Sequence, residues 1–500
     1  MSATLTSHAV EALKTRLFDL NALGAAMSIM DWDQQVLMPP GGGEARAEHL
    51  SILGRMYHEL LVEDQTLRLI EAAEAEAAPD SVESAICRLA RRSYEQATKI
   101  PTELVAEKIH LSSLAHEKWV AARAANDFTS FAPILERMFE ITGQEAEYLG
   151  YTNHIYDALI DHYETGATQA DCVAMYETLK KPMVELVAAI KAQPQVDDSA
   201  LHGEWDVALQ KQFTEKLTKA IGYDYSRGRQ DTAPHPFCTG WSVGDIRITT
   251  RFKPYLPSAI FGSLHEAGHA MYEQNSPMAW DRLPLAGGVS LGVHESQSRT
   301  WENIVGRSKP FWSHFLPELQ ATFPALKAYD LDTYYRAINK VEPSFIRVEA
   351  DEVTYNLHTL VRFEIECEVL TGKLRVRDIP EAWNAKYTSY LGITPKTDSE
   401  GCLQDVHWSG GSIGYFPTYT MGNLLSYQIW RALQRDLGDT DALIAKGDFA
   451  PILGWLTEHL YSLGSRYTPK ETVIRATGKP LDATEYIQGL TAKYTEIYRL

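Results

Sequence analysis

Cysteine is scarce in this chain. The 500 residues include five cysteines, an odd number at well-separated positions. Their spacing excludes a disulfide framework and a cysteine-ligated metal site. We therefore predict reduced thiols in a cytoplasmic protein, at Cys87, Cys172, Cys238, Cys367 and Cys402.

Basic residues are also in deficit. The sequence has 47 Lys and Arg against 66 Asp and Glu, which gives a formal net charge of -19 at pH 7. Nucleic-acid binding requires a clustered basic surface. This composition therefore argues against nucleic acid as a partner and predicts a solvated acidic surface.

The sequence lacks long hydrophobic runs and low-complexity linkers. The apolar stretch nearest the N-terminus, 22–30, contains Ser28 and ends at Asp31, and no basic segment precedes it as in a secretory signal. A membrane-spanning helix needs about 20 apolar residues, so we expect neither export nor contact with a membrane. The polar segments 78–80 and 193–198 are typical of turns between helices. We predict one unit over residues 1–500.

The most informative feature present is a His-Glu-x-x-His motif within the apolar, helix-compatible segment 263–272. Residues four apart lie on one helix face, about 5–6 Å apart at Cβ, so His265 and His269 can converge on one metal ion. Glu266 then lies near a metal-bound water and can accept its proton. No charge occupies either x position. The segment predicts the zinc site of a hydrolase.

A catalytic zinc site usually has three protein ligands, and a second helix-compatible segment, 292–303, contains candidates for the third. We predict Glu295 as this ligand. Glu302, two turns further along the same face, is an alternative ligand or a carboxylate that orients an imidazole N–H. His294 is the other alternative, but it points about 100° away from Glu295 on a helix. That direction suits a substrate contact better.

Apolar residues recur with helical spacing along most of the chain, which predicts helices that pack on a core. Two of these stripes are Val10, Leu13, Leu17 and Leu20, and Leu50, Leu53, Met56 and Leu60.

The segment 241–252 alternates instead. Asp245, Arg247 and Arg251 fall on one face, and isoleucines fall on the other. We predict a strand in a short sheet whose edge lines the active-site cleft and binds an extended peptide through its main chain. The alternative is a structural hairpin in which Asp245 and Arg247 pair for solubility.

Further motifs follow one another along the chain: Trp32-Asp33 leading to Met38-Pro39 and Arg46, then His-Pro-Phe at 235–237, Asp-Ile-Arg-Ile-Thr at 245–249, Ile-Arg-Val-Glu-Ala-Asp at 346–351 and Gly-Cys-Leu-Gln-Asp-Val-His-Trp at 401–408. With the zinc segments, they resemble in order and approximate spacing the carboxypeptidase Taq family, the M32 metallocarboxypeptidases. The resemblance covers nearly the whole chain.

This resemblance implies a mainly α, neurolysin-like metallopeptidase fold with two helical lobes around a deep cleft and a short β element near the zinc helix. It implies an enzyme that releases C-terminal amino acids from peptides. It also implies one Zn²⁺ per chain, with Co²⁺ able to occupy a similar N/O ligand set, and a homodimer.

The resemblance assigns roles around the scissile carbonyl as well. The developing oxyanion needs preorganised donors besides the metal, and by resemblance His407 and either Tyr415 or Tyr419 supply them. The glycine-rich segment 409–414 would let the backbone approach the substrate closely.

A carboxypeptidase also needs a fixed cation for the free terminal carboxylate, and the arginine fork suits it. By resemblance Arg347 is the first choice, although its spacing from Asp351 equally allows a helix-surface ion pair. Arg247 is the alternative. We also predict His235 and His294 as substrate contacts.

Two other functions compete with this one. The first is an oligoendopeptidase with the same zinc chemistry and no clamp for a terminal carboxylate. The second is a non-catalytic helical protein that keeps a metal for structure. Glu266 counts against the second, because a structural site needs ligands but no base.

Overall fold

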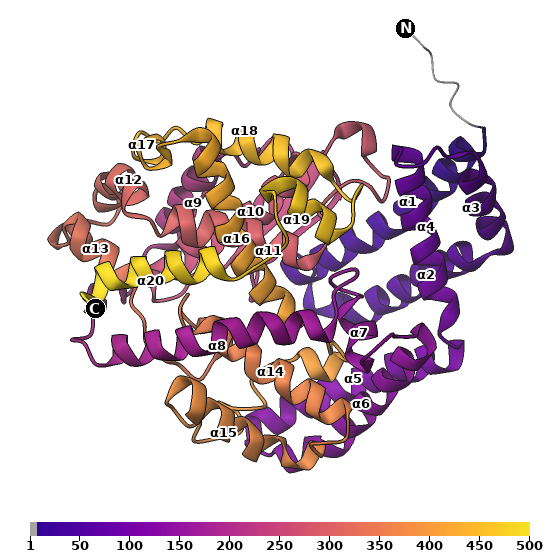
Figure 1. The fold of residues 1–500 in the computed structure, drawn as a ribbon, viewed down its shortest axis with the longest axis horizontal. Helices are drawn as coiled ribbons and strands as arrows, with labels where there is room; N and C mark the ends of the chain where they lie inside the picture. The colour runs from indigo at the N-terminus through magenta and orange to yellow at the C-terminus, as the bar shows by residue number, and fades with distance from the viewer. Residues whose placement is uncertain (1–7) are drawn as a thin grey trace, which may run out of the picture.

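Helices account for most of residues 8–500, the part of the chain that this computed structural model describes (Figure 1). The expected mainly α class is therefore confirmed. Among these residues, no helix has both the length and the apolar character needed to cross a membrane.

The N-terminal helices pack on one another around a small core of their own. The stripe from Val10 to Leu20 is buried in this core. The second predicted stripe is not core, because its members are half-buried and Met56 is 46% exposed. The four helices, at the right of Figure 1, are α1 (His8–Val36), α2 (Gly43–Val62), α3 (Asp64–Glu76) and α4 (Val82–Lys99).

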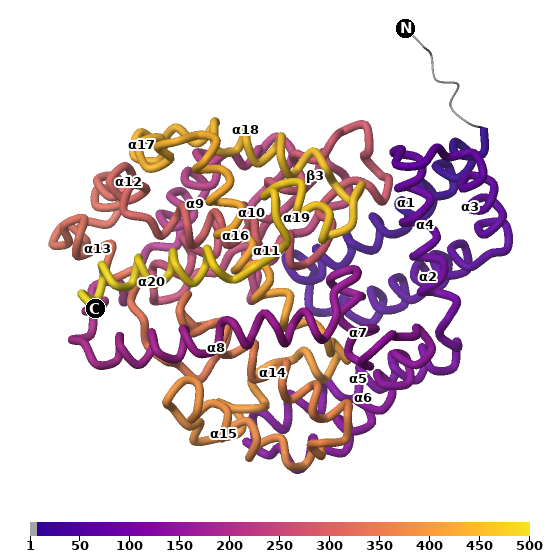
Figure 2. Tube along the Cα trace, in the orientation of Figure 1, coloured from indigo at the N-terminus to yellow at the C-terminus, as the bar shows by residue number. Residues whose placement is uncertain are grey.

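The second core joins helices from the N-terminal half to helices from the C-terminal half, and we call this part the α5–α8 lobe. Within it, α8 and α20 pack side by side across the middle of the molecule (Figure 2). The helices are α5 (Thr102–Ala125), α6 (Phe128–Leu149), α7 (Ile155–Ile160), α8 (Gln169–Lys191), α14 (Tyr355–Leu370), α15 (Ile379–Leu391) and α20 (Thr484–Tyr498).

The third core is built around the helix that carries the His-Glu-x-x-His motif, and we call this part the α10 lobe. Its helix α16 also places Met421 and Leu424 in the core of the α5–α8 lobe, so one helix connects both cores. The helices are α9 (Val207–Ile221), α10 (Leu256–Gln274), α11 (Leu291–Arg299), α12 (Lys309–Thr322), α13 (Leu331–Ile338), α16 (Phe416–Leu437), α17 (Thr440–Ala445), α18 (Ala450–His459) and α19 (Pro469–Thr477).

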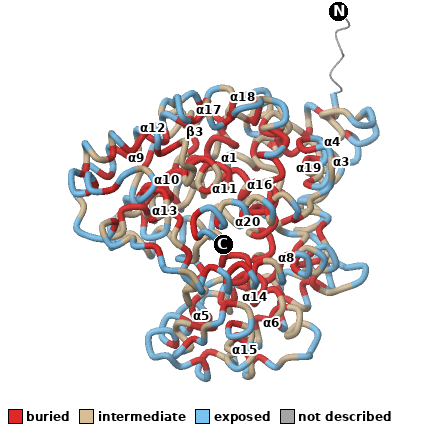
Figure 3. Tube along the Cα trace, turned by 60° about the vertical axis from the view of Figure 1, so that its left-hand side comes forward, coloured by how far each residue is buried: buried red, intermediate tan, exposed pale blue. Residues whose placement is uncertain are grey.

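The two lobes border a cleft with a volume of about 530 Å³. Trp119 and Arg123 of α5 line it from one lobe, and residues of α10 line it from the other. In Figure 3 buried segments concentrate where α10, α11, α14 and α16 lie, while exposed segments form the rim. The expected arrangement of two helical lobes around a cleft is present, and folding of the chain as one unit stays a prediction.

A three-stranded sheet lies beside α10. It consists of β1 (Gln230–Thr232), β2 (Cys238–Ser242) and β3 (Asp245–Thr250), in the order β1-β3-β2. The predicted strand 241–252 therefore contains the end of β2, a tight turn and then β3, which is shorter than the predicted strand. Its β3 is central: the Ile248 N–H donates to Arg229 O at 3.0 Å, and the Thr249 N–H donates to Phe237 O at 2.9 Å. Neighbouring segments thus already use the backbone of β3 on both sides, and the binding of a peptide at an edge of this sheet stays a prediction.

Candidate metal centre and substrate cleft

Helix α10 holds the two motif histidines on one of its faces. Pro257 lies in its first turn, where a backbone N–H would have no acceptor within the helix, so proline costs no hydrogen bond there. Leu264 and Ala267 face the core of the α10 lobe. The rings of His265 and His269 lie next to each other, with centroids 4.9 Å apart. The local spacing thus places both imidazoles as the motif predicts.

Two glycines allow the helix that carries Glu295, the third predicted ligand, to pack close to these histidines. A Cβ on Gly268 of α10 would lie 2.6 Å from Gln297 O and 2.8 Å from Ser298 Cα. A Cβ on Gly422 of α16 would lie 2.6 Å from the Cβ of Glu295. Helix α11 therefore fits between α10 and α16 only because both positions lack a side chain.

The three predicted ligands form a site that fits a tetrahedral divalent metal. The Nε2 atoms of His265 and His269 lie 3.6 Å and 3.4 Å from Oε2 of Glu295. The three ligand atoms lie within 4.8 Å of one another. Zinc bonds of about 2.0–2.1 Å at tetrahedral angles would separate ligand atoms by about 3.3 Å. The observed spacing matches, and one coordination position remains for water.

Glu302 contacts one of the predicted ligands, His265. Its Oε2 is 2.9 Å from Nδ1 of His265, on the side of the ring away from Glu295. Arg299 donates to Glu295 at 2.7 Å and to Glu302 at 3.2 Å. The segment Thr300–Gly306 is π-helical, a form common at functional sites. Although burial opposes it, the charges of Arg299 and His265 lower the pKa of Glu302 to about 2.

His294 lies behind the metal ligands, away from the cleft. Its Nδ1 is 2.6 Å from Nδ1 of His269, and its Nε2 is 2.7 Å from Glu273. His294 is therefore not part of the cleft lining but bridges His269 to the carboxylate of Glu273, and its role as a substrate contact stays a prediction. Burial, with the nearby His294 and His265, lowers the pKa of His269 to about 4, which favours the neutral ring that ligates metals.

Glu266 lines the cleft beside His265 and is only 6% exposed. Within residues 8–500 its carboxylate has neither a hydrogen-bond nor an ion-pair partner. Burial, reinforced by Glu295 and Glu302, raises its pKa to about 7. A carboxylate with such a pKa is suited to taking and returning a proton near neutrality.

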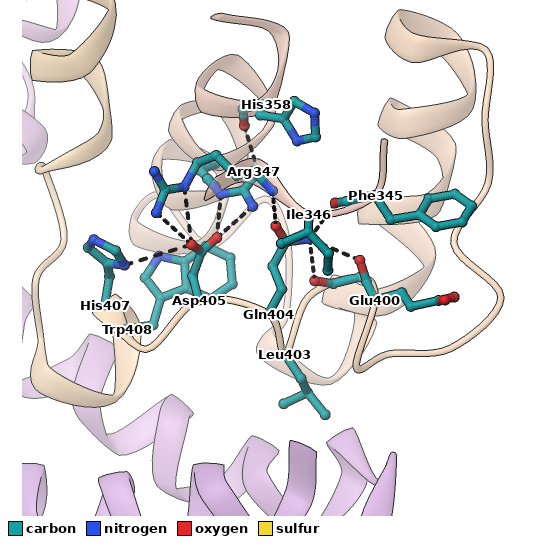
Figure 4. Close-up of polar contacts among 12 residues, drawn as sticks. Phe345, Ile346, Arg347, His358, Glu400, Leu403, Gln404, Asp405, His407 and Trp408 are labelled. Carbon is teal, nitrogen blue, oxygen red and sulfur yellow. Dashed lines mark hydrogen bonds and ion pairs between the residues drawn. The ribbon is translucent and has the colours of Figure 1, made fainter. Parts of the chain in front are cut away.

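The wall opposite α10 contains His407 and a buried charge cluster (Figure 4). Arg347 donates to Asp405 Oδ1 from Nε at 3.1 Å and from Nη2 at 2.9 Å, while Arg362 Nε donates to Oδ2 at 2.6 Å. His407 Nδ1 lies 3.8 Å from the same carboxylate. Burial, with the two arginines, lowers the pKa of His407 to about 4. Its ring is therefore neutral at pH 7.

The two candidate tyrosines meet edge to face, with centroids 5.2 Å apart. Tyr419 lines the cleft. Tyr415 lies behind it and contacts the rings of His407 and Tyr163. The structure thus places Tyr419 nearer to a bound substrate.

Arg347 is not the exposed helix residue that its sequence spacing allowed. It is 3% exposed, lines the cleft, and donates to Tyr355 Oη at 2.7 Å besides Asp405. Asp351 instead accepts hydrogen bonds from its own turn, including the Thr354 N–H at 3.0 Å.

Arg247 lies outside the cleft lining. It donates to Asp245 at 2.9 Å from two nitrogens, and its guanidinium stacks 4.3 Å from the ring centroid of Trp32 and 4.5 Å from that of Trp241. The structure therefore favours the hairpin ion pair over a role as carboxylate clamp for Arg247.

Sequence reasoning missed Arg251 as a cleft cation. Arg251 lines the cleft together with the predicted contact His235 and has a single long contact, 3.4 Å, to Glu349. Burial, with the charges of Arg251, Lys253 and others, lowers the pKa of His235. The position of Arg251 at the end of the alternating segment 241–252 was the sequence signal that could have indicated this cation.

Known proteins resemble this chain over almost its full length. Residues 12–494 match the model of the carboxypeptidase Taq (M32) metallopeptidase family. The chain is 40% identical over 493 residues to thermostable carboxypeptidase 1 of Thermus thermophilus, which covers 96% of each protein. It is 39% identical over 480 residues to carboxypeptidase 1 of Bacillus subtilis, covering 95% of this chain and 96% of that protein.

A solved structure agrees with the sequence comparisons. The M32 carboxypeptidase of Deinococcus radiodurans superposes with a TM-score of 0.96 at 38% identity, over 99% of this chain and all of that chain. The resemblance predicted from the motifs is therefore confirmed, and the competing endopeptidase and non-catalytic functions gain no support. The chain belongs to the carboxypeptidase Taq (M32) family and is a metal-dependent carboxypeptidase, a hydrolase of peptide bonds.

Proposed function

We propose that His265, His269 and Glu295 bind one zinc ion and that the enzyme removes single C-terminal residues from peptides with free carboxyl ends. The observation that carries this proposal is the convergence of the three ligand atoms beside the unpaired carboxylate of Glu266. Cobalt suits the same nitrogen and oxygen donors, so metal identity is a question for elemental analysis.

Bound zinc would polarise the scissile carbonyl and lower the pKa of its water. Glu266 would take a proton from the attacking water and return it to the leaving amine, a transfer that its pKa near neutrality favours. Glu302 and His294 hold the two imidazoles by their remaining nitrogens.

His407 and Tyr419 provide donors on the opposite side of the cleft. Neutral His407 and the phenol of Tyr419 each have an N–H or O–H group for the carbonyl oxygen as it gains charge. Asp405 and its two arginines fix the wall that carries His407. Tyr415 supports Tyr419 from behind.

For the terminal carboxylate we propose Arg251 as the main contact, aided by His235. Arg123 and Arg251 line this end of the cleft beside His235, and Arg251 has only a long contact of 3.4 Å to Glu349 among residues 8–500, so this part of the cleft wall presents positive charge. Arg347, our choice from sequence, already shares Asp405 and has fewer free donors. We propose that Arg347 makes a secondary contact to the terminal carboxylate, beside Arg251 and His235.

The experiment that tests the function compares one peptide with a free C-terminal acid and its amide, with and without a chelator. Mass analysis should show stepwise loss of single residues from the free acid alone, abolished by the chelator and restored by Zn²⁺. Internal cleavage of the amide would favour an endopeptidase instead.

We also propose a cytoplasmic homodimer, as the family resemblance implies, with peptides as partners and no role for nucleic acid or membranes. The net charge of -19 supports the exclusion of nucleic acid. Light scattering of the purified chain tests the dimer, and a measured mass near 56.1 kDa would contradict it.

A further inference from the structure

A buried carboxylate that the reaction does not use lies at the start of the helix that carries Glu295. Glu164, in the segment between α7 and α8, is 8% exposed. Its Oε1 accepts from the Ser290 hydroxyl at 2.9 Å, and its Oε2 accepts from the Gly292 N–H at 2.9 Å. Within residues 8–500 it forms no ion pair with a cation.

The neighbouring residue contributes to the same connection. The Leu291 N–H donates to Tyr163 O at 3.0 Å. Because the first N–H groups of a helix have no partner within it, the dipeptide 163–164 supplies acceptors for two of them at the start of α11. The Ser290 hydroxyl accepts a hydrogen bond from the Val293 N–H at 3.2 Å.

Gly292 shows how closely Glu164 fits. A Cβ at this position would lie 2.6 Å from Oε2 of Glu164 and 3.2 Å from the Cβ of Met421. The carboxylate therefore occupies the space that any other residue type would fill. Glu295 stands three residues further, less than one helical turn away.

Glu164 also connects the two lobes. Ile160 and Ala167, which flank its segment, are in the core of the α5–α8 lobe. Leu264 and Ala267, beside the motif histidines, are in the core of the α10 lobe. The start of α11, whose Val293 packs in the core of the α10 lobe, is thus also bonded to the α5–α8 lobe through the segment that carries Glu164.

The start of α11 supplies both of the hydrogen bonds that stabilise the Glu164 carboxylate. Burying a carboxylate without a cation is unfavourable, and burial raises the pKa of Glu164 to about 7. The positive end of the α11 macrodipole compensates only part of that penalty.

We infer that Glu164 is a positioning residue for the metal centre: it holds the first turn of α11 so that Glu295 meets His265 and His269. This inference rests on the proposed ligand role of Glu295. Tyr163 extends the connection to the substrate side, because its ring meets that of Tyr415 edge to face at 5.1 Å.

The test is a Zn²⁺ titration against a competing chelator, which reads metal affinity without using activity. Glu164→Met keeps the side-chain length and removes both acceptors. We expect its Zn²⁺ dissociation constant to rise about 10-fold, at the low end of the range for groups that orient metal ligands. Glu164→Gln keeps an acceptor for the Gly292 N–H and should recover most of the affinity.

Glu366 provides the matched control. It is also fully buried, and it accepts the Gly414 N–H at 3.2 Å, Trp408 Nε1 at 2.8 Å and Tyr156 Oη at 2.8 Å, but it does not touch α11. Glu366→Met should lower the thermal midpoint of the metal-free protein and leave the Zn²⁺ dissociation constant within about twofold.

Two results would overturn the inference: wild-type metal affinity in Glu164→Met, or an equal loss of affinity in Glu366→Met. If Glu164→Met does not fold, Ser290→Ala removes one contact from the opposite side and should weaken Zn²⁺ binding about threefold, and unchanged binding there would count against the inference too. Glu295→Ala distinguishes failure of this inference from failure of the proposed function, because metal retained at wild-type affinity in that variant refutes the ligand assignment itself.

Discussion

Three carboxylates near the metal site differ in their partners. Glu295 and Glu302 share Arg299, and its charge outweighs burial to lower the pKa of both. Glu266 has no such cation, and burial raises its pKa to about 7. When their environments give two groups of the same chemical type different pKa values, the groups can take different roles in a reaction. Here two remain ionised as ligand and support, while the third can exchange a proton.

The first prediction concerns the proton acceptor. Glu266→Gln keeps the size and helix propensity of the residue but cannot accept a proton, so kcat should fall about 10²–10⁴-fold. Elemental analysis should still find one metal per chain. Near-normal turnover in the metal-loaded variant would assign the base elsewhere.

The second prediction concerns the terminal carboxylate. Arg251→Ala should reduce kcat/KM for a free-acid peptide about 10–150-fold, the equivalent of one charged hydrogen bond of about 1.5–3 kcal/mol. It should scarcely change the already poor cleavage of the amide. Lys253→Ala is the control, since Lys253 shares Glu349 but does not line the cleft.

Arg347→Ala gives the contrasting pattern. Because Arg347 holds Asp405 beside His407, its loss should lower cleavage of the free acid and the amide alike. If Arg347→Ala abolished only the preference for the free acid, and Arg251→Ala left that preference intact, the clamp would belong to Arg347.

At the scale of elements, the site depends on how closely three helices approach. Helix α11 lies between α10 and α16 at Gly268 and Gly422, where a methyl group would overlap backbone or Cβ atoms. Helix α11 therefore has little freedom to shift sideways, which suits an element that must deliver a ligand with sub-ångström precision.

The third prediction tests this packing. Gly268→Ala forces α10 and α11 apart and should lower the free energy of unfolding by about 1–3 kcal/mol, with weaker Zn²⁺ binding. Gly262→Ala on the same helix is the control, because its new Cβ would lie 3.9 Å from Thr250 Oγ1 and 4.0 Å from Pro236 Cγ, both ordinary contact distances. It should be neutral or stabilising by up to about 1 kcal/mol. Equal effects in urea unfolding would contradict the argument.

At the scale of the whole molecule, Asp405 joins segments far apart in the chain. Its partners come from position 347 and from α14, and the adjacent Gln404 side chain accepts the Arg347 N–H at 2.8 Å and donates to Phe345 O at 2.8 Å. Burial raises the pKa of Asp405, but Arg347 and Arg362 outweigh it and hold that pKa well below its usual range.

The fourth prediction follows from this linkage. A depressed carboxyl pKa contributes stability above the unfolded-state pKa of about 3.9, and that stability is lost as the pH falls toward the folded-state value. Asp405→Asn should therefore lower the free energy of unfolding by about 3–5 kcal/mol at pH 7, with a smaller difference from wild type below about pH 4.

The matched control for that variant is Asp378→Asn. Its partner Arg375 is 62% exposed at the side chain, and surface pairs contribute about 0–1 kcal/mol. A pH-independent deficit in Asp405→Asn, measured by urea unfolding at both pH values, would show that the charge of Asp405 is not what stabilises the cluster.

The sequence by itself determined what depends on short-range geometry. The spacing of His265 and His269 on one helix predicts their convergence, since four residues make nearly one helical turn. The same geometry predicted Glu302 on the face of Glu295. The motif order, read as a family resemblance, carried the activity and the fold, and the comparisons confirm both.

Only the tertiary structure decided which partners these residues meet. Arg347 pairs with Asp405 rather than with Asp351, which is closer in sequence, and His294 contacts His269 outside the cleft lining. The strand predicted from the alternating segment is central in its sheet, because residues 229 and 237 pair with its backbone from the two sides. Such contacts join positions far apart in sequence, and helical or strand periodicity specifies a face of an element without specifying what packs against it.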